Sequence, residues 1–187
     1  NKNNFKDFNL YFQDESRFGL MIHVGSIITA KGVRPKVKFQ HKFATTYLYV
    51  SYSPIDGDAF VYEIDGVSTE IFEAYLHEFS LHRPDQAKIV VIDNAGFHST
   101  KNIEIPENII LLRIPPYSPE LNFCEQVWAY IKSRYKNKVF ADINLLKEWL
   151  HSIIKSMKPS TIKSIVSNHH YLKALLAPCQ NRISISY

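Results

Sequence analysis

The sequence predicts a single α/β domain, and three observations support this prediction. The chain has 187 residues, 45% of them hydrophobic, which is enough for one core and too few for two full domains. Short runs of β-prone residues fill the first two-thirds, and helical periods fill the last third. Two of the short runs are almost entirely apolar, as is typical of strands that helices cover on both faces.

The first half of the chain reads as strands. Leu10 to Asp14 alternates apolar and polar positions, and Leu20 to Val24 follows a Phe18-Gly19 pair, so we expect an antiparallel hairpin that turns at this pair. Thr45 to Tyr52 and Ala59 to Ile64 are rich in β-branched and aromatic residues and predict two further strands.

A helix should begin after Ser68, which is a good N-cap residue. Its apolar positions are Ile71, Phe72, Tyr75, Leu76 and Phe79. Two runs follow that are apolar apart from Lys88 and Arg113, Lys88 to Ile92 and Ile109 to Ile114, and both predict strands buried on both faces. Pro115 and Pro116 should end the second run.

Helical periods dominate from Asn122 onward. The apolar positions of three successive segments are Val127, Ile131 and Tyr135, then Leu145, Leu146, Trp149, Leu150, Ile153 and Ile154, then Ile162, Ile165 and Val166. We therefore expect residues 141–187 to form C-terminal helices that pack on the core, with the whole of 1–187 as one domain.

Composition narrows the functional classes. The net charge of +4 and the pI near 8.9 are compatible with a nucleic-acid partner. Cys124 and Cys179 are far apart, so neither a zinc site nor a disulfide framework is indicated. No apolar run reaches the length of a membrane span, and the N-terminal residues lack the apolar core of a signal peptide. We expect a cytoplasmic protein with no membrane partner.

Three acidic residues stand in unusual settings: Asp14 in YFQDES, Asp93 in IVVIDNAGFH and Glu125 in PELNFCEQVW. Side chains alternate along a strand, so Asp14 and Asp93 would each close a row of core-facing residues. If the two strands are parallel neighbours, these acids meet at one edge of the sheet. Glu125, near a helix start, can point to the same crevice, and clustered carboxylates favour a divalent metal ion.

Simpler interpretations exist for each acid. Asp14 and Asp93 could each lie in a turn or at a cap. Glu125 could complete a capping box with Asn122 as N-cap, which would hold its carboxylate away from a metal. Glu15 competes with Asp14 but should face the opposite side of the sheet, and Glu120 competes with Glu125 but lies in the turn before the helix.

Taken together, the blocks DES, VVIDNAGFH and LRIPPYSPELNFCEQVW resemble the catalytic domain of the DDE transposases, specifically bacterial insertion-sequence transposases related to the mariner superfamily. The resemblance spans Phe12 to Lys132, and its motif acids fall on Asp14, Asp93 and Glu125. The last two are separated by 125 − 93 = 32 positions, slightly fewer than is usual in the family. The chain departs from the family at Phe123-Cys124, where Pro-Ile is common.

The resemblance implies an RNase H-like fold: a mixed five-stranded sheet, its first three strands antiparallel, with helices on both faces. It also implies that Asp14, Asp93 and Glu125 hold two Mg²⁺ or Mn²⁺ ions and that the domain cleaves DNA and joins it to a target by in-line phosphoryl transfer. The expected partners are transposon ends and target DNA, including TA dinucleotides, and a second copy of the chain in a homodimer. The expected setting is the bacterial cytoplasm, in association with the nucleoid.

The family usually carries helix-turn-helix modules ahead of the first acid. Only 13 residues precede Asp14, so we expect that part to be absent from this chain. Two residues near Asp93 have predicted supporting roles: Asn94 would orient Asp93, and His98 would contact a metal-bound water or a phosphate, although His98 could equally be a packing residue.

A basic stretch could hold the DNA. Its members are Lys31, Arg34, Lys36, Lys38 and Lys42. These side chains would neutralise backbone phosphates, although they could equally be a solvated hairpin. Two other functions stay open from the sequence: another RNase H-like nuclease, and a catalytically silent DNA-binding or assembly module derived from a transposon.

Overall fold

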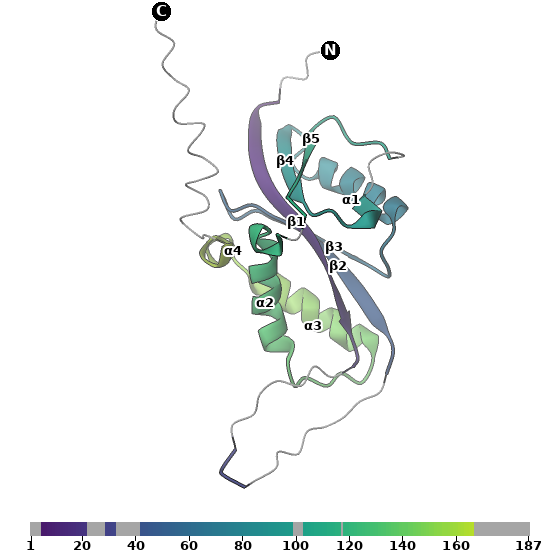
Figure 1. Ribbon diagram of the computed structural model, residues 1–187, viewed down its shortest axis with the longest axis vertical. Coiled ribbons are helices and arrows are strands. Elements are labelled where there is room, and N and C mark those ends of the chain that lie inside the picture. The colour runs from purple at the N-terminus through teal and green to yellow at the C-terminus, as the bar shows by residue number, and fades with distance from the viewer. Residues whose placement is uncertain (1–4, 22–28, 33–41, 99–102, 117, 167–187) are drawn as a thin grey trace, which may run out of the picture.

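A computed structural model describes residues 5–21, 29–32, 42–98, 103–116 and 118–166. In this part of the chain, five strands form one sheet in the order β3-β2-β1-β4-β5, and four α-helices pack against it (Figure 1). The predicted α/β architecture is confirmed.

The sheet is mixed. The strands β1 (Asp7–Gly19), β2 (Thr45–Tyr52) and β3 (Ala59–Ile64) pair antiparallel, whereas β4 (Gln86–Ile92) and β5 (Ile109–Arg113) run parallel to β1. The prediction that the first three strands are antiparallel is therefore confirmed, and β1, the longest strand, joins the antiparallel half of the sheet to the parallel half.

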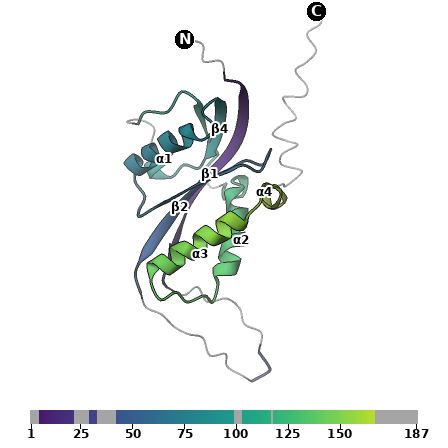
Figure 2. The same ribbon diagram turned by 180° about the vertical axis from the view of Figure 1, so that it is seen from behind.

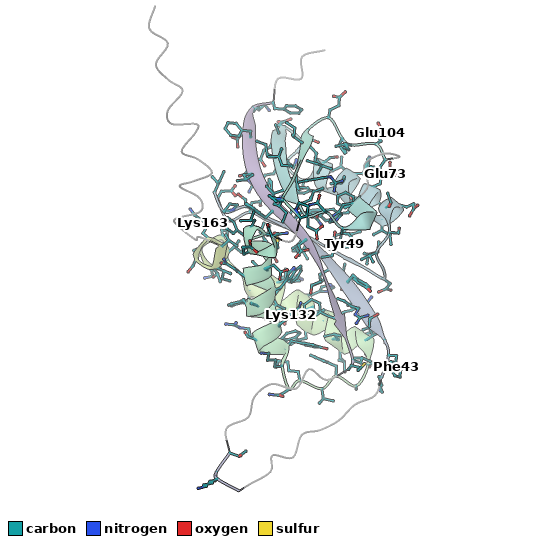
Figure 3. The ribbon with its side chains drawn as sticks, in the orientation of Figure 1. Phe43, Tyr49, Glu73, Glu104, Lys132 and Lys163 are labelled. Carbon is teal, nitrogen blue, oxygen red and sulfur yellow. The ribbon has the colours of Figure 1, made fainter. Side chains whose placement is uncertain are left out.

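Helices lie on both faces of the sheet. Helix α1 (Thr69–Leu81) covers one face, and α2 (Cys124–Tyr135), α3 (Ile143–Ser156) and α4 (Pro159–Val166) lie on the other (Figure 2). Tyr49 lies among the buried side chains between the sheet and α1 (Figure 3), with its ring 5.4 Å from that of Tyr75 in α1.

Alternation along β1 divides the core into two clusters. Tyr11 faces α1 together with Tyr49 and Val90. Phe12 faces α2 together with Val50 and Val91. Each face therefore takes every second residue, and neighbouring residues of β1 serve opposite sides of the sheet.

The predicted hairpin at Phe18-Gly19 is wrong. Strand β1 runs through both residues, because residues 12–19 form a continuous antiparallel ladder with β2 that ends at Gly19↔Thr45. A Cβ at Gly19 would lie only 2.9 Å from Cγ2 of Thr45. Gly19 thus permits close approach of the two strands rather than a turn. Of the predicted second strand, residues 22–24 lie outside the described residues.

The prediction that both apolar runs are buried on both faces is half correct. In β4, residues Val90 to Ile92 are at most 8% exposed. Strand β5, in contrast, forms the edge of the sheet, and its Ile110 and Leu112 are 55% and 49% exposed. No described helix covers the face of β5 that carries Ile110 and Leu112, and an apolar run in the sequence cannot show this.

The helix predictions are confirmed in their positions. Ser68 is the N-cap of α1, and its hydroxyl accepts a hydrogen bond from the backbone N–H of Ile71 at 3.2 Å. Asp142 caps α3 in the same way through the N–H groups of Asn144 and Leu145. Of the predicted C-terminal helical region, residues 167–187 lie outside the described part of the chain.

Candidate active site

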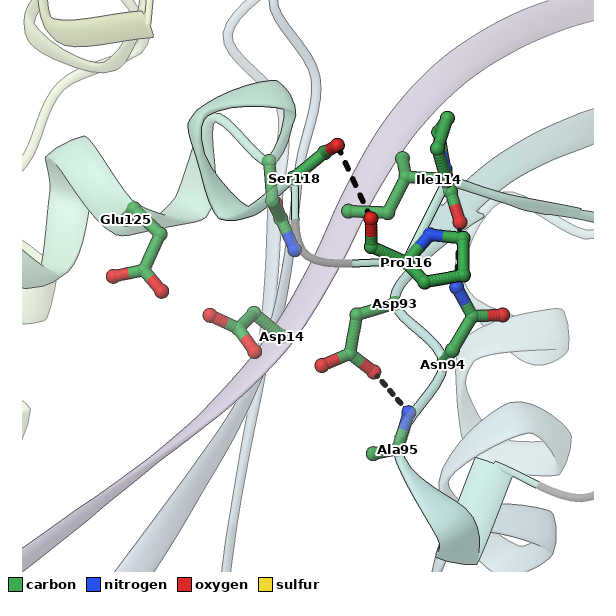
Figure 4. Close-up of a pocket in the computed structure, with 10 residues that line it drawn as sticks. Asp14, Asp93, Asn94, Ala95, Ile114, Pro116, Ser118 and Glu125 are labelled. Carbon is green, nitrogen blue, oxygen red and sulfur yellow. Dashed lines mark hydrogen bonds between the residues drawn. The ribbon is translucent and has the colours of Figure 1, made fainter.

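The three predicted acids line one pocket of about 440 Å³. Asp14 comes from the middle of β1, Asp93 follows the end of β4, and Glu125 lies in the first turn of α2. Figure 4 shows Asp14 between the other two acids. The remaining residues of the lining are Asn94, Ala95, Ile114, Pro115, Pro116, Ser118 and Asn122.

The parallel pairing of β1 with β4 brings Asp14 and Asp93 together. The last paired residues are Phe12 and Val91. Asp14 lies two residues after Phe12 on the same face of β1, and Asp93 lies two residues after Val91, just beyond the end of β4. Strand β4 ends at Ile92 while β1 continues to Gly19. Asp14 therefore lies inside β1 rather than at its end. The pocket opens beside it because the neighbouring strand, β4, ends earlier.

Glu125 does not form the capping box that was a simpler interpretation. The N-cap of α2 is Phe123, and it makes no capping hydrogen bond through its side chain. Asn122 instead accepts from the N–H of Cys124 and donates its amide to the backbone oxygen of Gln13 in β1. This pair of bonds ties the start of α2 to β1, and the exposed carboxylate of Glu125 faces the pocket.

Asp14 is held by Trp128. The indole Nε1–H donates to Oδ2 of Asp14 at 2.9 Å, and the indole itself is only 2% exposed. Burial, together with the negative charges of Glu15 and Glu125, raises the pKa of Asp14 to about 7, although the Trp128 hydrogen bond opposes the change. The sequence did not point to this bond between Trp128 and Asp14. The available signal was that a buried indole N–H needs an acceptor.

Asp93 is fixed through one of its two oxygens. Its Oδ1 accepts from the N–H of Ala95 at 2.9 Å and contacts Nδ1 of His98 at 2.7 Å. The hydrogen bond from His98 holds the pKa of Asp93 below its ordinary value. Asn94 does not bond to Asp93, because its amide donates to the backbone oxygen of Ile114. That bond joins the loop after β4 to the end of β5.

His98 lies beneath the pocket rather than in it. Its side chain is fully buried, and its two ring nitrogens contact carboxylates on opposite sides: Nδ1 contacts Asp93, and Nε2 contacts Oε1 of Glu15 at 2.9 Å. Burial by itself would lower the pKa of His98, but the two carboxylates outweigh it and raise the pKa to about 9. Glu15 faces away from Asp14, as alternation predicted, but its pairing with His98 was not foreseen.

The competing acid Glu120 lies in a 3₁₀ turn (Pro119–Leu121) and is exposed. It is not among the residues that line the pocket. Glu125 is therefore the acid of this region that faces Asp14.

The predicted basic stretch falls largely outside the described residues. Arg34, Lys36 and Lys38 lie there, whereas Lys31 and Lys42 are described and exposed. The amine of Lys42 donates to the backbone oxygen of Ala141, just before α3. That contact places one end of the basic stretch beside the α2–α3 connection.

The chemistry of the pocket suits a hard divalent cation. Asp14, Asp93 and Glu125 offer carboxylate oxygens, the ligands that Mg²⁺ and Mn²⁺ prefer. Within the described ranges, no three His, Cys, Asp or Glu side chains are already gathered as a metal cage. Carboxylates that repel one another across a pocket are expected to separate without a cation between them. The charge of Glu125 also contributes to the raised pKa of Asp14, although burial is the largest cause.

In the part of the chain that the structure describes, no helix has the length and apolar character needed to cross a membrane.

Comparison with known proteins adds evidence from sequence and fold. The model of the DDE superfamily endonuclease family matches residues 9–147. The uncharacterized protein y4pE/y4sA of Sinorhizobium fredii (strain NBRC 101917 / NGR234) is 32% identical over 98 residues, which cover 51% of this chain and 73% of that protein.

Two solved structures share the fold. The Mos1 transposase paired-end complex with left transposon end gives a TM-score of 0.70 at 14% identity, and the Mos1 mariner paired end complex with Mn gives 0.67 at 14%. Each match covers 90% of this chain and 55% of that chain, so the chain spans about half the length of these structures. They confirm the predicted RNase H-like fold.

Proposed function

Because the chain belongs to the DDE superfamily endonucleases, we propose that it is a transposase catalytic domain that cuts DNA and joins the freed end to a target. The observation that carries this proposal is the pocket shared by Asp14, Asp93 and Glu125, which collects three carboxylates from three separate segments beside the C-terminal end of β4. The matched family region contains all three acids and most of the elements that position them.

The three acids would hold two Mg²⁺ or Mn²⁺ ions. When bound, such ions activate the attacking oxygen and stabilise the leaving oxygen of an in-line displacement at phosphorus. The chain itself supplies position: Trp128 holds Asp14, His98 and Ala95 hold Asp93, and the Asn122 bonds hold the start of the helix that carries Glu125. Asn94 supports the pocket by fixing the adjacent loop to Ile114. No protein nucleophile is required.

The proposed partners are transposon ends and target DNA, with TA dinucleotides favoured because TA steps deform easily. Lys31, Arg34, Lys36, Lys38 and Lys42 would neutralise backbone phosphates. Transposition joins two DNA ends, so we propose a homodimer in the active complex. The proposed setting is the bacterial cytoplasm, in association with the nucleoid.

The test replaces each acid by its amide: Asp14→Asn, Asp93→Asn and Glu125→Gln. Each change removes a charge at nearly constant shape, so each should abolish cleavage of DNA in Mg²⁺ or Mn²⁺ while circular dichroism stays unchanged. A strand-transfer assay with a pre-cleaved 3′ end measures the joining step separately. Cleavage without joining would point to another RNase H-like nuclease instead.

Glu120→Gln is the matched control, because Glu120 is an exposed acid close in sequence to Glu125 that does not line the pocket. This variant should cut and join DNA at the normal rate. Near-normal cleavage by any of the three acid variants would remove that residue from the site, and inactivity of the wild-type chain on every DNA substrate would leave a catalytically silent module as the better description.

A further inference from the structure

A buried chain of polar contacts connects Glu15 to Asp93. Glu15 follows Asp14 directly but faces the α1 side of the sheet, where its side chain is 7% exposed. Its Oε1 lies 2.9 Å from Nε2 of His98 and accepts a second hydrogen bond from the amide of Gln13 at 2.6 Å. The other nitrogen of His98 contacts Oδ1 of Asp93 at 2.7 Å.

We propose that Glu15 is a positioning residue of the metal site, which acts on Asp93 through His98 and is not itself a metal ligand. This inference rests on the proposed function. It assigns separate tasks to the two adjacent acids of the Asp14-Glu15 pair: Asp14 faces the pocket, and Glu15 holds the other pocket acid from the opposite face of the sheet.

The geometry of His98 supports this role. Phe72 of α1 packs against the imidazole with ring centroids 4.5 Å apart, and the backbone oxygen of His98 accepts from Arg113. The ring is therefore fixed by packing on one side and by a carboxylate at each nitrogen. A His side chain that is fixed in this way can hold Asp93 in only one orientation.

The two carboxylate oxygens of Asp93 therefore have different surroundings. Oδ1 is occupied by two donors, Ala95 and His98. The other oxygen points toward Asp14 in the pocket (Figure 4). Glu15→Gln would replace the charged acceptor of Nε2 by a neutral amide, which bonds more weakly and can turn its NH₂ group toward the ring instead. In this variant the ring would no longer be held firmly at the angle that sets the direction of Asp93.

The test measures Mn²⁺ binding to the chain without DNA, from the electron paramagnetic resonance signal of free Mn²⁺. Glu15→Gln should weaken Mn²⁺ binding by about 10- to 100-fold, as is typical when a residue behind a metal ligand is changed. Cleavage should return to within a few-fold of the wild-type rate once Mn²⁺ is saturating, because the ligands themselves are intact. Glu120→Gln, the same change at an exposed site, should leave the affinity unchanged.

Three results would overturn the inference. Mn²⁺ affinity within about twofold of wild type in folded Glu15→Gln would show that Glu15 only stabilises the fold. Cleavage that stays lost at saturating Mn²⁺ would make Glu15 a ligand or a reacting group. Additive losses in the double variant Glu15→Gln/His98→Gln would show that Glu15 does not act through His98, since a residue that acts through His98 has no further effect once His98 is gone.

Two further measurements separate a folding defect, or failure of the proposed function, from failure of this inference. Should Glu15→Gln fold poorly, Glu15→Asp keeps the charge and withdraws the carboxylate by one methylene; it should also weaken Mn²⁺ binding, and unchanged affinity would overturn the inference. Failure of the proposed function gives a different pattern, because wild-type protein would then bind no Mn²⁺ at the pocket and Asp14→Asn would have no effect on binding.

Discussion

Asp14 combines burial with two acidic neighbours. It lies inside β1, beneath α2, and the charges of Glu15 and Glu125 add to the cost of ionising it, so that its pKa rises to about 7. Trp128 donates one hydrogen bond to its carboxylate, which reduces this cost without removing it. In the absence of a cation, the ionised carboxylate of Asp14 therefore destabilises the folded chain.

This imbalance predicts a pH-dependent effect of Asp14→Asn on stability in metal-free buffer. The folded-state pKa is above the ordinary value of 3.8, so the folded chain binds more protons than the unfolded chain between about pH 4 and pH 7, and its stability falls as the pH rises through this window. The amide does not ionise and can still accept from Trp128. The variant should be close to wild type at pH 4 and more stable at pH 8 by on the order of 1–4 kcal/mol.

Urea unfolding of both proteins at several pH values, with a chelator present, measures this difference. An equal stability change at pH 4 and pH 8 would contradict the assignment of the raised pKa to Asp14. Added Mn²⁺ provides a second check, because it should stabilise the wild-type chain and narrow or reverse the advantage of the variant.

At the scale of single residues, the sequence predicted the faces of the strands but not the partners across the fold. Alternation placed Glu15 opposite Asp14, as found. The bonds from Trp128 to Asp14 and from His98 to Glu15 join residues 114 and 83 positions apart. Contacts of this kind depend on how helices and loops return to the sheet, and no local pattern encodes them.

At the scale of elements, the sequence predicted strands and helix ends correctly where residues close in sequence determine them. Strands β2 and β3 have the predicted bounds, and Ser68 caps α1 as predicted. The prediction of a hairpin at Gly19 was wrong because a glycine that permits close contact between strands cannot be told from a turn glycine in the sequence. The prediction that β5 is buried on both faces was wrong because β5 lies at the edge of the sheet, and the order of strands in a sheet cannot be read from their composition.

Gly57 offers a test of how the elements are joined. It lies in the connection between β2 and β3 with a φ of +78°, and an added Cβ would lie 2.2 Å from the backbone oxygen of Pro159, the first residue of α4. Gly57→Ala should therefore force α4 away from this turn. We expect a loss of at least about 2 kcal/mol of unfolding free energy beyond the cost of the positive φ alone.

Gly32→Ala is the matched control, because Gly32 also has a positive φ, of +86°, and no atom of the described residues lies within 4 Å of its added Cβ. The difference between the two variants in urea unfolding isolates the contact with Pro159. Equal losses would mean that α4 is not held against this turn in solution.

At the scale of the whole molecule, the described helices all have a structural task. The buried residues of α1 to α4 belong to the two clusters that flank the sheet. Each of these four helices therefore has a face that is committed to covering the sheet. DNA contact by this chain should rely on charge and on the pocket.

The basic stretch predicts a measurable salt dependence. If Lys36, Lys38 and Lys42 contact phosphates, neutralising all three should weaken binding to every DNA sequence about equally and reduce the slope of log affinity against log salt by roughly 3. Neutralising Lys155, Lys158 and Lys163, which lie on or beside α3 and α4, removes the same charge and should change the slope far less. Equal effects of the two triple variants would mean that only net charge matters.

The same arrangement predicts that this chain binds DNA with little sequence preference. Specific binding requires contacts to base edges, which phosphate contacts cannot replace. A competition titration of the chain against its element's end sequence and against random duplex should give affinities within about tenfold, or about 1.4 kcal/mol, far below the ~4–10 kcal/mol of a dedicated sequence reader. Shuffled duplexes of equal length and base composition control for non-specific charge effects. A preference of several hundredfold for the element end would reveal a recognition surface in the chain beyond the charges and the pocket.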